Sequence, residues 1–238
     1  MSTPPPSPKR PYRGASAQER QTERRERLLA AAFDCFGTEG YHNTTMRLIC
    51  AKARLAERYF YESFESVHAA YVEVYAQSAR QAAMSTLAAR EANPDFNAFQ
   101  KSEAGVRAFL EFIKNDARQA RILLTDSITS GVANPLNLGM HINAYVPFFR
   151  GRLRSRFPHL SADVNMEFIV GGLVGMVIHV AIIWAGQSFA EPVDKVLDHL
   201  MYAWRGLGLW LDEHNQPPDD VGLAKQKSGP KGPQEEST

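Results

Sequence analysis

Residues 24–71 decide the fold, and they read RRERLLAAAFDCFGTEGYHNTTMRLICAKARLAERYFYESFESVHAAY. The segment opens with an apolar stripe at helical spacing, made of Leu28, Leu29, Ala32, Phe33 and Phe36. Gly37 and Gly40 mark the end of this helix, and the Thr44-Thr45 pair offers a cap for a second helix through about Ala53. A break at 54–56 and a short third helix through Tyr61 complete a predicted helix-turn-helix unit.

The third helix is short and dense in hydrogen-bonding side chains. Its apolar residues are spaced to anchor it to the first two helices, and they are Leu55, Phe60 and Phe64. Arg58, Tyr59 and Tyr61 are then left to face outward. An arginine can pair with guanine O6 and N7, and a tyrosine can pack on a thymine methyl or donate to an acceptor. We therefore predict base reading by Arg58 and Tyr59, with contact to phosphate alone as the alternative.

The whole stretch resembles the DNA-binding domain of TetR-type transcriptional regulators. The positions that match in order and spacing are Phe36, Gly40, Thr44, Thr45, Ile49, Ala53, Leu55, Tyr61 and Phe64. The rest of the chain resembles the family only in length and helical character. The resemblance implies that Thr45 and Tyr61 contact phosphate, where the alternatives are a second cap residue and a core tyrosine.

Three positions depart from the family pattern. Arg54 stands where a turn glycine is usual, and a left-handed conformation there would cost an arginine about 1 kcal/mol. Ala56 stands where a Ser or Thr normally caps the recognition helix, a loss of roughly 0.5–2 kcal/mol. Val67 replaces a common phosphate-binding lysine, and Arg54 offers compensating positive charge.

The complete set of predicted DNA contacts lies within 18 residues of each other along the chain, and it is Thr44, Thr45, Arg47, Arg54, Arg58, Tyr59 and Tyr61. Arg47 lies one turn into the second helix and could instead be a solvated surface side chain. The clustered Arg24, Arg25 and Arg27 either steer DNA or only solvate the first helix. The predicted partner is double-stranded DNA.

The distribution of charge suggests a polyanion partner for one end of the chain, and the alternative is a solvated basic helix with a basic tail. The 238 residues carry a net charge of +1, but residues 1–60 hold 11 Lys and Arg against 6 Asp and Glu. The N-terminus, MSTPPPSPKRPYRG, has no apolar run, so we expect no secretory signal and a cytoplasmic location. Two cysteines cannot build a disulfide scaffold, and Cys35 and Cys50 are expected to be reduced core thiols.

The chain is predicted to be all-α, because no sustained alternation or hairpin signal is present. Four parts are expected: a disordered, basic, proline-rich arm (1–17), a helix-turn-helix domain (18–64), a helical ligand-binding and dimerisation domain (65–213) and a disordered tail (214–238). Within the third part, helices are expected at about 65–92, 96–114, 116–130, 136–157, 161–186 and 190–213.

Residues 168–186, FIVGGLVGMVIHVAIIWAG, are almost continuously apolar. Their length falls in the ~17–25-residue window of membrane spans, so a membrane-associated or purely structural helical dimer is an alternative reading. Against a span stand His179 in mid-run, Glu167 at one edge and the absence of a flanking basic cluster. The resemblance to TetR-type regulators implies that this helix and a second at 193–211 form a four-helix bundle between the subunits of a homodimer, away from membranes.

The resemblance also implies a cavity for a small apolar effector among the middle helices. Aromatic density suggests the candidates Phe109, Phe112, Phe148, Phe149, Met176, His179 and Trp184. His179 could equally be an ordinary core or interface histidine. The long helix at about 65–92 would join this cavity to the DNA-binding head.

No enzyme motif competes with this reading. The sequence has no G-x-S-x-G, P-loop or H-E-x-x-H, and no Cys/His spacing suited to a metal. We therefore expect no enzymatic activity, no cofactor and no metal. The prediction is a dimeric one-component transcriptional regulator, specifically a repressor that an effector releases from its operator.

Overall fold

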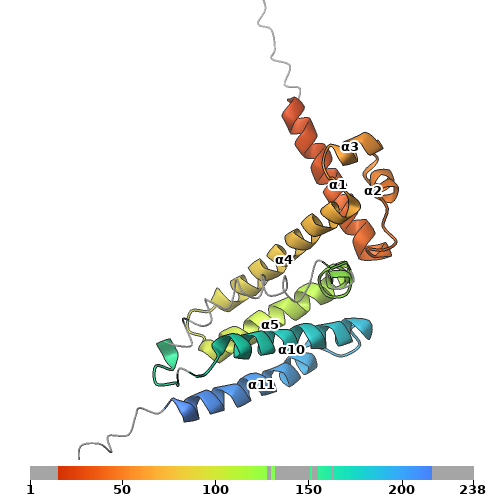
Figure 1. The fold of residues 1–238 in the computed structure, drawn as a ribbon. Coiled ribbons are helices and arrows are strands. Elements are labelled where there is room, and N and C mark those ends of the chain that lie inside the picture. Colours follow the sequence, from red (N-terminus) through yellow and green to blue (C-terminus); the bar gives the residue numbers. More distant parts are fainter. Residues whose placement is uncertain (1–15, 128–129, 132–150, 152–154, 162, 216–238) are drawn as a thin grey trace, which may run out of the picture.

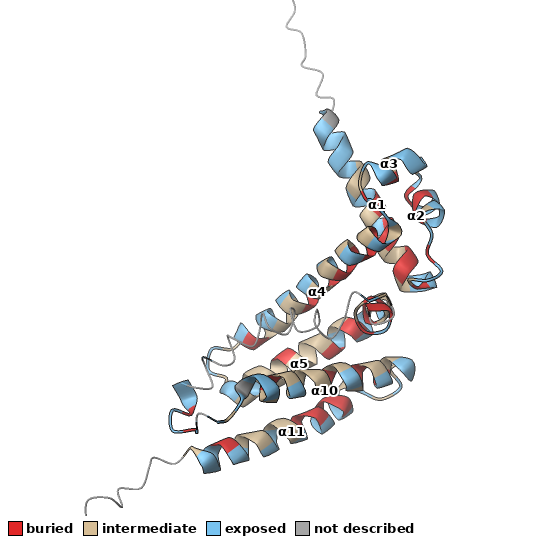
Figure 2. Cartoon of the chain, in the orientation of Figure 1, coloured by how far each residue is buried: buried red, intermediate tan, exposed pale blue. Residues whose placement is uncertain are grey.

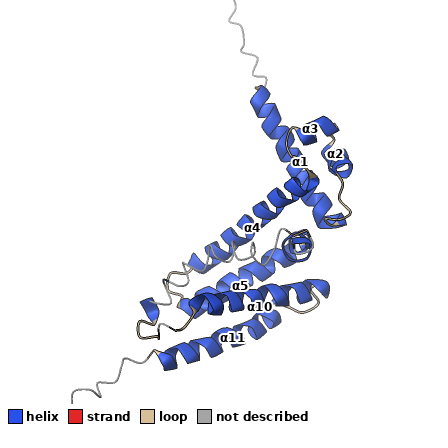
Figure 3. Cartoon of the chain, viewed as in Figure 1, coloured by secondary structure: helices blue, strands red, loops and turns tan. Residues whose placement is uncertain are grey.

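The structure is a computed structural model that describes residues 16–127, 130–131, 151, 155–161 and 163–215. Helices account for nearly all of the regular structure in these ranges, and the described residues include no strand (Figure 3). The predicted all-α fold, with an N-terminal helix-turn-helix domain followed by a helical C-terminal domain, is confirmed.

Three helices form the N-terminal head, and they are α1 (Ala17–Glu39), α2 (Met46–Ala53) and α3 (Glu57–Tyr61) (Figure 1). A capping box between Ser16 and Glu19 starts α1. The helix continues through Gly37 and ends at Gly40, which has a φ of 88° and donates its N–H to the Phe36 carbonyl at 3.1 Å. Gly40 therefore stops the helix, as predicted, whereas Gly37 lies within it.

The remaining helices form the body. α4 (Val67–Glu91) runs from the head along the length of the body and packs on α5 (Ala98–Asn115) (Figure 1). α6 (Ala117–Ala120) follows, and then a π-helical segment, η1 (Arg121–Asp126). α10 (Met166–Gly186) and α11 (Val193–His214) lie beside α5.

Helix boundaries follow local signals, with one exception. Asn165 caps α10 through the N–H groups of Glu167 and Phe168, and Pro192 precedes α11. The single helix expected at 116–130 is instead a short α-helix followed by π-helix. The helix expected at 136–157 falls mostly outside the described residues.

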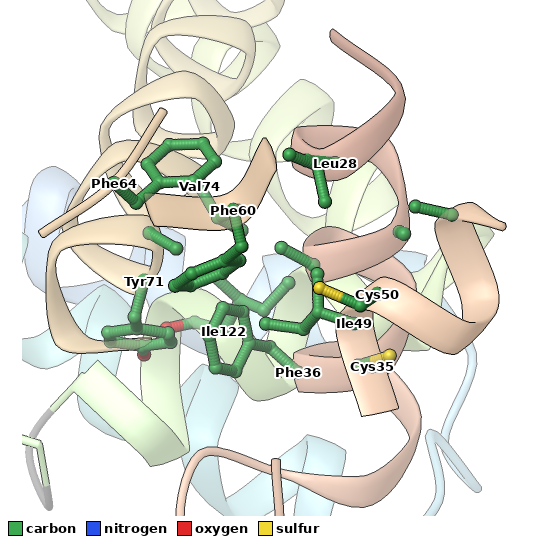
Figure 4. Close-up of a cluster of buried hydrophobic side chains, with 14 of the residues drawn as sticks. Leu28, Cys35, Phe36, Ile49, Cys50, Phe60, Phe64, Tyr71, Val74 and Ile122 are labelled. Atoms are coloured by element: carbon green, nitrogen blue, oxygen red, sulfur yellow. The ribbon is translucent and has the colours of Figure 1, made fainter. Parts of the chain in front are cut away.

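Two large apolar cores hold most of these helices together, and a third, small cluster joins Phe157 and Leu160 to Leu211 of α11. The head core contains Leu28, Phe36, Ile49, Phe60 and Phe64, and it also takes in Tyr71 and Val74 of α4 and Ile122 of η1 (Figure 4). Cys35 and Cys50 lie in this core as free thiols, and burial raises the pKa of both. The body core joins α5 and α6 to α10 and α11 around Leu110, Ile113, Trp184, Leu197 and Met201. The head is therefore packed on the first turns of α4 and on η1.

Candidate nucleic-acid interface

The turn between α2 and α3 adopts the conformation predicted for it. Arg54 ends α2 in the left-handed region, with φ 53° and ψ 47°, where a glycine would be less strained. The N–H of Leu55 donates to the Cys50 carbonyl at 3.0 Å and closes the turn. Ala56 precedes α3 without a side-chain cap, as its methyl group requires. The turn thus brings α3 across α2 in spite of two unfavourable residues.

α3 buries one side chain and presents its neighbours. Phe60 is 1% exposed in the head core, whereas Tyr61 is 64% exposed and Arg58 is exposed beside it. The exposure of Tyr61 excludes the core role that the sequence left open. Arg58 and Tyr61 lie one turn apart on a short helix, an arrangement suited to contacting base edges and phosphate together.

Tyr59 is half-buried and lies between two arginines. The guanidinium of Arg24 from α1 lies 4.5 Å from the centre of its ring, and that of Arg58 lies 4.6 Å away. Arg58 also donates to the Tyr59 hydroxyl. Tyr59 is therefore placed to orient two cations, which fits a base reader less well than the sequence suggested.

These contacts separate the three clustered arginines of α1. Arg25 forms an ion pair with Glu73 and so joins the head to α4, whereas Arg27 donates to the Ala53 carbonyl at 2.7 Å and so joins α1 to α2 within the head. Arg24 lies over the Tyr59 ring of α3, whereas Arg25 lies over the Phe64 ring, 5.1 Å from its centre. The packing of α1 on α3 therefore selects Arg24 among the three as a candidate phosphate contact.

The start of α2 divides the two threonines. Thr45 is exposed and caps the helix, with its hydroxyl oxygen accepting the Leu48 N–H at 3.2 Å. Thr44 is buried and donates its hydroxyl to the Gly40 carbonyl at 2.8 Å. Thr44 is therefore a structural residue of the loop, in place of the DNA contact predicted for it, because its side chain points into the head.

The positively charged side chains of α2 and of the turn after it differ in exposure and in their acidic partners. Arg47 is 85% exposed and lies 3.4 Å from the Glu57 carboxylate, and Arg54 is also exposed. Lys52 is instead paired with Asp34 at 3.3 Å. Val67, at the position of the family lysine, is half-buried against the head core. The phosphate contacts predicted on this face therefore fall to arginines and hydroxyl groups.

The head is clamped to the body by charged side chains of α6 and η1. Arg118 pairs with Asp34 of α1, and Arg121 donates to the carbonyls of Thr38 at 2.6 Å and Glu39 at 3.1 Å. The backbone N–H of Tyr41 donates to Asp126 at 2.9 Å. A Cβ at Gly37 would collide with the Arg118 side chain, so this glycine permits the close approach.

A hollow of about 300 Å³ lies between α4, α5 and α6, and of the predicted effector contacts Phe112 lines it. Phe109 and Met176 pack instead against the body core, and Trp184 is 2% exposed with its indole N–H donating to the Glu191 carbonyl at 3.0 Å. His179 is exposed on α10, so it does not line this hollow. Phe148 and Phe149 lie outside the described residues.

α10 and α11 leave much of their apolar surface uncovered (Figure 2). By length and composition the helix Glu167–Gly186 could cross a membrane, with a mean hydropathy of 2.3, and 22% of that window is buried within the chain. A Cβ at Gly171, Gly172 or Gly175 would meet no atom of the described residues within 4 Å. Large apolar side chains on these two helices are also exposed, among them Phe168, Ile183, Tyr202 and Leu209.

Comparison with known proteins agrees with this geometry. The family described as "Bacterial regulatory proteins, tetR family" matches residues 28–66. The HTH-type transcriptional activator FasR of Mycolicibacterium smegmatis is 29% identical over 206 residues, which cover 84% of this chain and 90% of FasR.

Solved structures share the fold over most of the chain. A TetR-like transcriptional regulator from Rhodococcus sp. RHA1 superposes with a TM-score of 0.59 at 23% identity, covering 78% of this chain and 96% of that one. The fatty acid degradation regulator FadR from Bacillus halodurans gives a TM-score of 0.63 at 11% identity, covering 75% and 93%.

Proposed function

We propose that this chain, which belongs to the TetR family of helix-turn-helix transcriptional regulators, binds operator DNA as a cytoplasmic homodimer under the control of a small apolar effector. The observation that carries the proposal is α3. It is anchored by Phe60 and exposes Arg58 and Tyr61 on a head whose own core is closed. A helix with this division of faces is built to touch something outside the chain.

In the proposed complex α3 enters the major groove, where Arg58 pairs with a guanine and Tyr61 donates to phosphate. Thr45 and Arg24 flank α3 and contact the backbone on either side. One such helix per chain reads one half-site, so a two-fold dimer would read two half-sites roughly 34–36 Å apart, or a multiple of that distance.

The exposed apolar surface of α10 and α11 supports the dimer. Glycines at 171, 172 and 175 leave room for a second helix to approach closely, and no part of the described chain fills that room. Two copies that pair through α10 and α11 would bury the apolar side chains that each chain leaves exposed. We favour this occupant over a lipid bilayer because α10 packs along α11 and contacts α5, as a helix of a folded body does.

Effector control would pass through two elements that connect the head to the body. α4 contributes to the head core and also packs along α5, while Arg118 and Arg121 hold the head from the body side. An effector that binds one placement of the head better than the other shifts the population toward that placement. The shift is limited by the difference between the two affinities.

Two directions of regulation are considered, repression and activation. The sequence predicts a repressor, whereas the name of the M. smegmatis relative makes activation a second candidate. No enzymatic activity, cofactor or metal is part of the proposal. The described residues include no group of three or more His, Cys, Asp or Glu side chains placed to hold a metal ion.

Genomic footprinting of the full-length protein, followed by a reporter assay on the sites recovered, tests the proposal. We expect pseudo-palindromic sites, and we expect reporter output to rise when the gene for this protein is deleted. A fall in output on deletion would establish activation. Recovery of no specific site would contradict the DNA-binding function itself.

A further inference from the structure

The hollow between α4, α5 and α6 contains a buried hydrogen-bond acceptor that the described chain does not satisfy. Gln119 lines the hollow and is 7% exposed, and its Oε1 has no hydrogen-bond partner among the described residues. Its Nε2 donates to Gln81 Oε1 across 3.4 Å, which orients the amide. Native proteins leave few buried polar atoms unpaired, because such an atom has lost its bond to water and gained none in return. A donor from outside the chain would supply the missing bond.

The walls of the hollow define what kind of donor fits. Phe112 supplies an apolar surface, and Ser85, Glu111, Asn115 and Asp116 supply mostly acceptor oxygens. None of the described residues that line the hollow is a lysine or an arginine. The carboxylate of Asp116 accepts from Arg118 through both oxygens, at 2.9 and 2.7 Å, and this contact holds its pKa below the ordinary value. A ligand carboxylate here would meet two protein carboxylates and no cation of the lining.

We propose that this hollow binds the end of a neutral effector that carries a hydroxyl or amide N–H on an apolar body, and that this donor bonds to Gln119 Oε1. The proposal rests on the function proposed above and specifies the class of the effector. The volume of about 300 Å³ lies at the lower end of ligand sites in proteins, so a short alkyl chain with one polar end is a suitable occupant.

The position of the site connects it to the head. Gln119 belongs to α6, one residue from Arg118, which joins Asp116 at the rim of the hollow to Asp34 of α1. An occupant that bonds to Gln119 therefore restrains the short helix that holds the head. Among the described residues, no other buried side-chain nitrogen or oxygen lacks a hydrogen-bond partner.

Three probes of equal chain length test the ligand class on the full chain: octan-1-ol, octanoate and heptyl methyl ether. Binding is measured by calorimetry and by the rise in melting temperature. We expect octan-1-ol to bind about ten-fold more tightly than either of the others, as a net hydrogen bond of ~1.4 kcal/mol implies. The ether has an acceptor but no donor, and octanoate has a charge.

Gln119→Leu removes the amide and puts an apolar side chain in its place. In this variant we expect octan-1-ol and the ether to bind within about two-fold of each other. Gln119→Met, which keeps the length of the side chain, repeats the test if the first variant does not fold. Gln18→Leu, at an exposed glutamine of α1, is the matched control and should preserve the preference for octan-1-ol.

Tighter binding of octanoate or of the ether to the wild-type chain would overturn the proposed ligand class, and so would an unchanged preference in Gln119→Leu. Operator binding is measured on the same samples. Operator binding without any probe preference would contradict this site alone, whereas probe preference without operator binding would contradict the proposed function and leave the site standing.

Discussion

The head and the α10–α11 pair differ in how far each buries its own apolar side chains. In the head, the large apolar residues close on one another, with Leu28, Phe36 and Ile49 fully buried, and the exposed side chains of α3 are polar or aromatic. On α10 and α11, Phe168 is 78% exposed and Leu209 is 73% exposed. Among the described residues, the core of the head is closed, whereas large apolar side chains of the C-terminal pair remain exposed.

This difference separates two kinds of function. A closed core frees the surface of the head for a charged partner, whose binding depends on a few hydrogen-bonding groups and on salt. An open apolar face needs an apolar partner, and its contribution is shape and buried area. Variants of one region should therefore change DNA recognition, and variants of the other should change assembly.

The largest expected effect is the response of the head to salt. If each dimer makes ~6–10 phosphate contacts, operator affinity should fall ~10³–10⁵-fold between 50 and 200 mM salt. Dimerisation through α10 and α11 should change little over the same range, because it buries apolar surface. Gel-shift titrations beside light scattering measure the two together. A flat salt response, or a complex with one monomer, would contradict the comparison.

Gly175→Leu addresses the open face, and its effect should be smaller. A Cβ at Gly175 would meet no atom of the described residues within 4 Å, so we expect the bulk of the leucine to disturb a partner. We expect overpacking of ~1–3 kcal/mol at the dimer interface, a shift to monomers and a loss of operator binding with the head still folded. Size-exclusion chromatography with light scattering measures the shift.

Ala88→Leu, at an exposed position of α4, is the matched control and should remain a dimer. If α10 instead spanned a membrane, Gly175→Leu would raise its hydropathy and leave insertion intact. A soluble Gly175→Leu dimer that binds DNA normally would place Gly175 away from the interface.

Within the head, Arg58→Ala and Tyr61→Phe should fail in different ways. Loss of Arg58 should cost ~1–3 kcal/mol and relax the preference at one base pair, because a guanine contact is lost. Loss of the Tyr61 hydroxyl should weaken all sequences about equally. Selection from random DNA distinguishes the two outcomes.

Arg80→Ala, on the exposed side of α4 below the head, controls for the loss of a positive charge. If the consensus sequence selected by Arg58→Ala is unchanged, another residue reads the base. Arg47 would then be the next candidate, since it is 85% exposed and borders Glu57.

The sequence was sufficient where structure depends on neighbours along the chain. The left-handed Arg54, the uncapped Ala56 and the cap at Thr45 were all predictable from residues 44–61. It was insufficient where the answer depends on packing between distant segments. The burial of Thr44 is set by the Gly40 carbonyl, and the position of Arg24 is set by the Tyr59 ring.

The body shows the same limit more strongly. α10 is apolar on every side, so no stripe fixes its rotation, and the exposure of His179 could not be inferred. No proline or glycine interrupts residues 117–127, so the sequence carried no signal for the change from α6 to the π-helix η1. The unsatisfied oxygen of Gln119 exists only because α4, α5 and α6 meet around it.

The smallest expected effect concerns Asp116, whose partner Arg118 also pairs with Asp34 and so holds the head to the body. Arg118 lowers the pKa of Asp116, so the ionised carboxylate stabilises the folded state above its ordinary pKa of ~3.9, and that contribution is lost as pH falls through and below this value. Asp116→Asn keeps an oxygen that can cap α6 but removes the charge. Because the pair is partly exposed, we expect the variant to be less stable at pH 7 by at most about 1 kcal/mol.

The difference should shrink as pH falls below ~3.9, and it should close only below the lowered pKa of Asp116 in the folded state, where both side chains are neutral. Thermal melts of both proteins between about pH 2 and pH 7 measure it, with Asp95→Asn as the control at an exposed carboxylate. A difference that does not shrink over this range would mean that Asp116 acts through shape rather than charge. The clamp between head and body would then rest on the backbone contacts of Arg121 and Asp126, and the ion pair of Arg118 with Asp34 would be a secondary support.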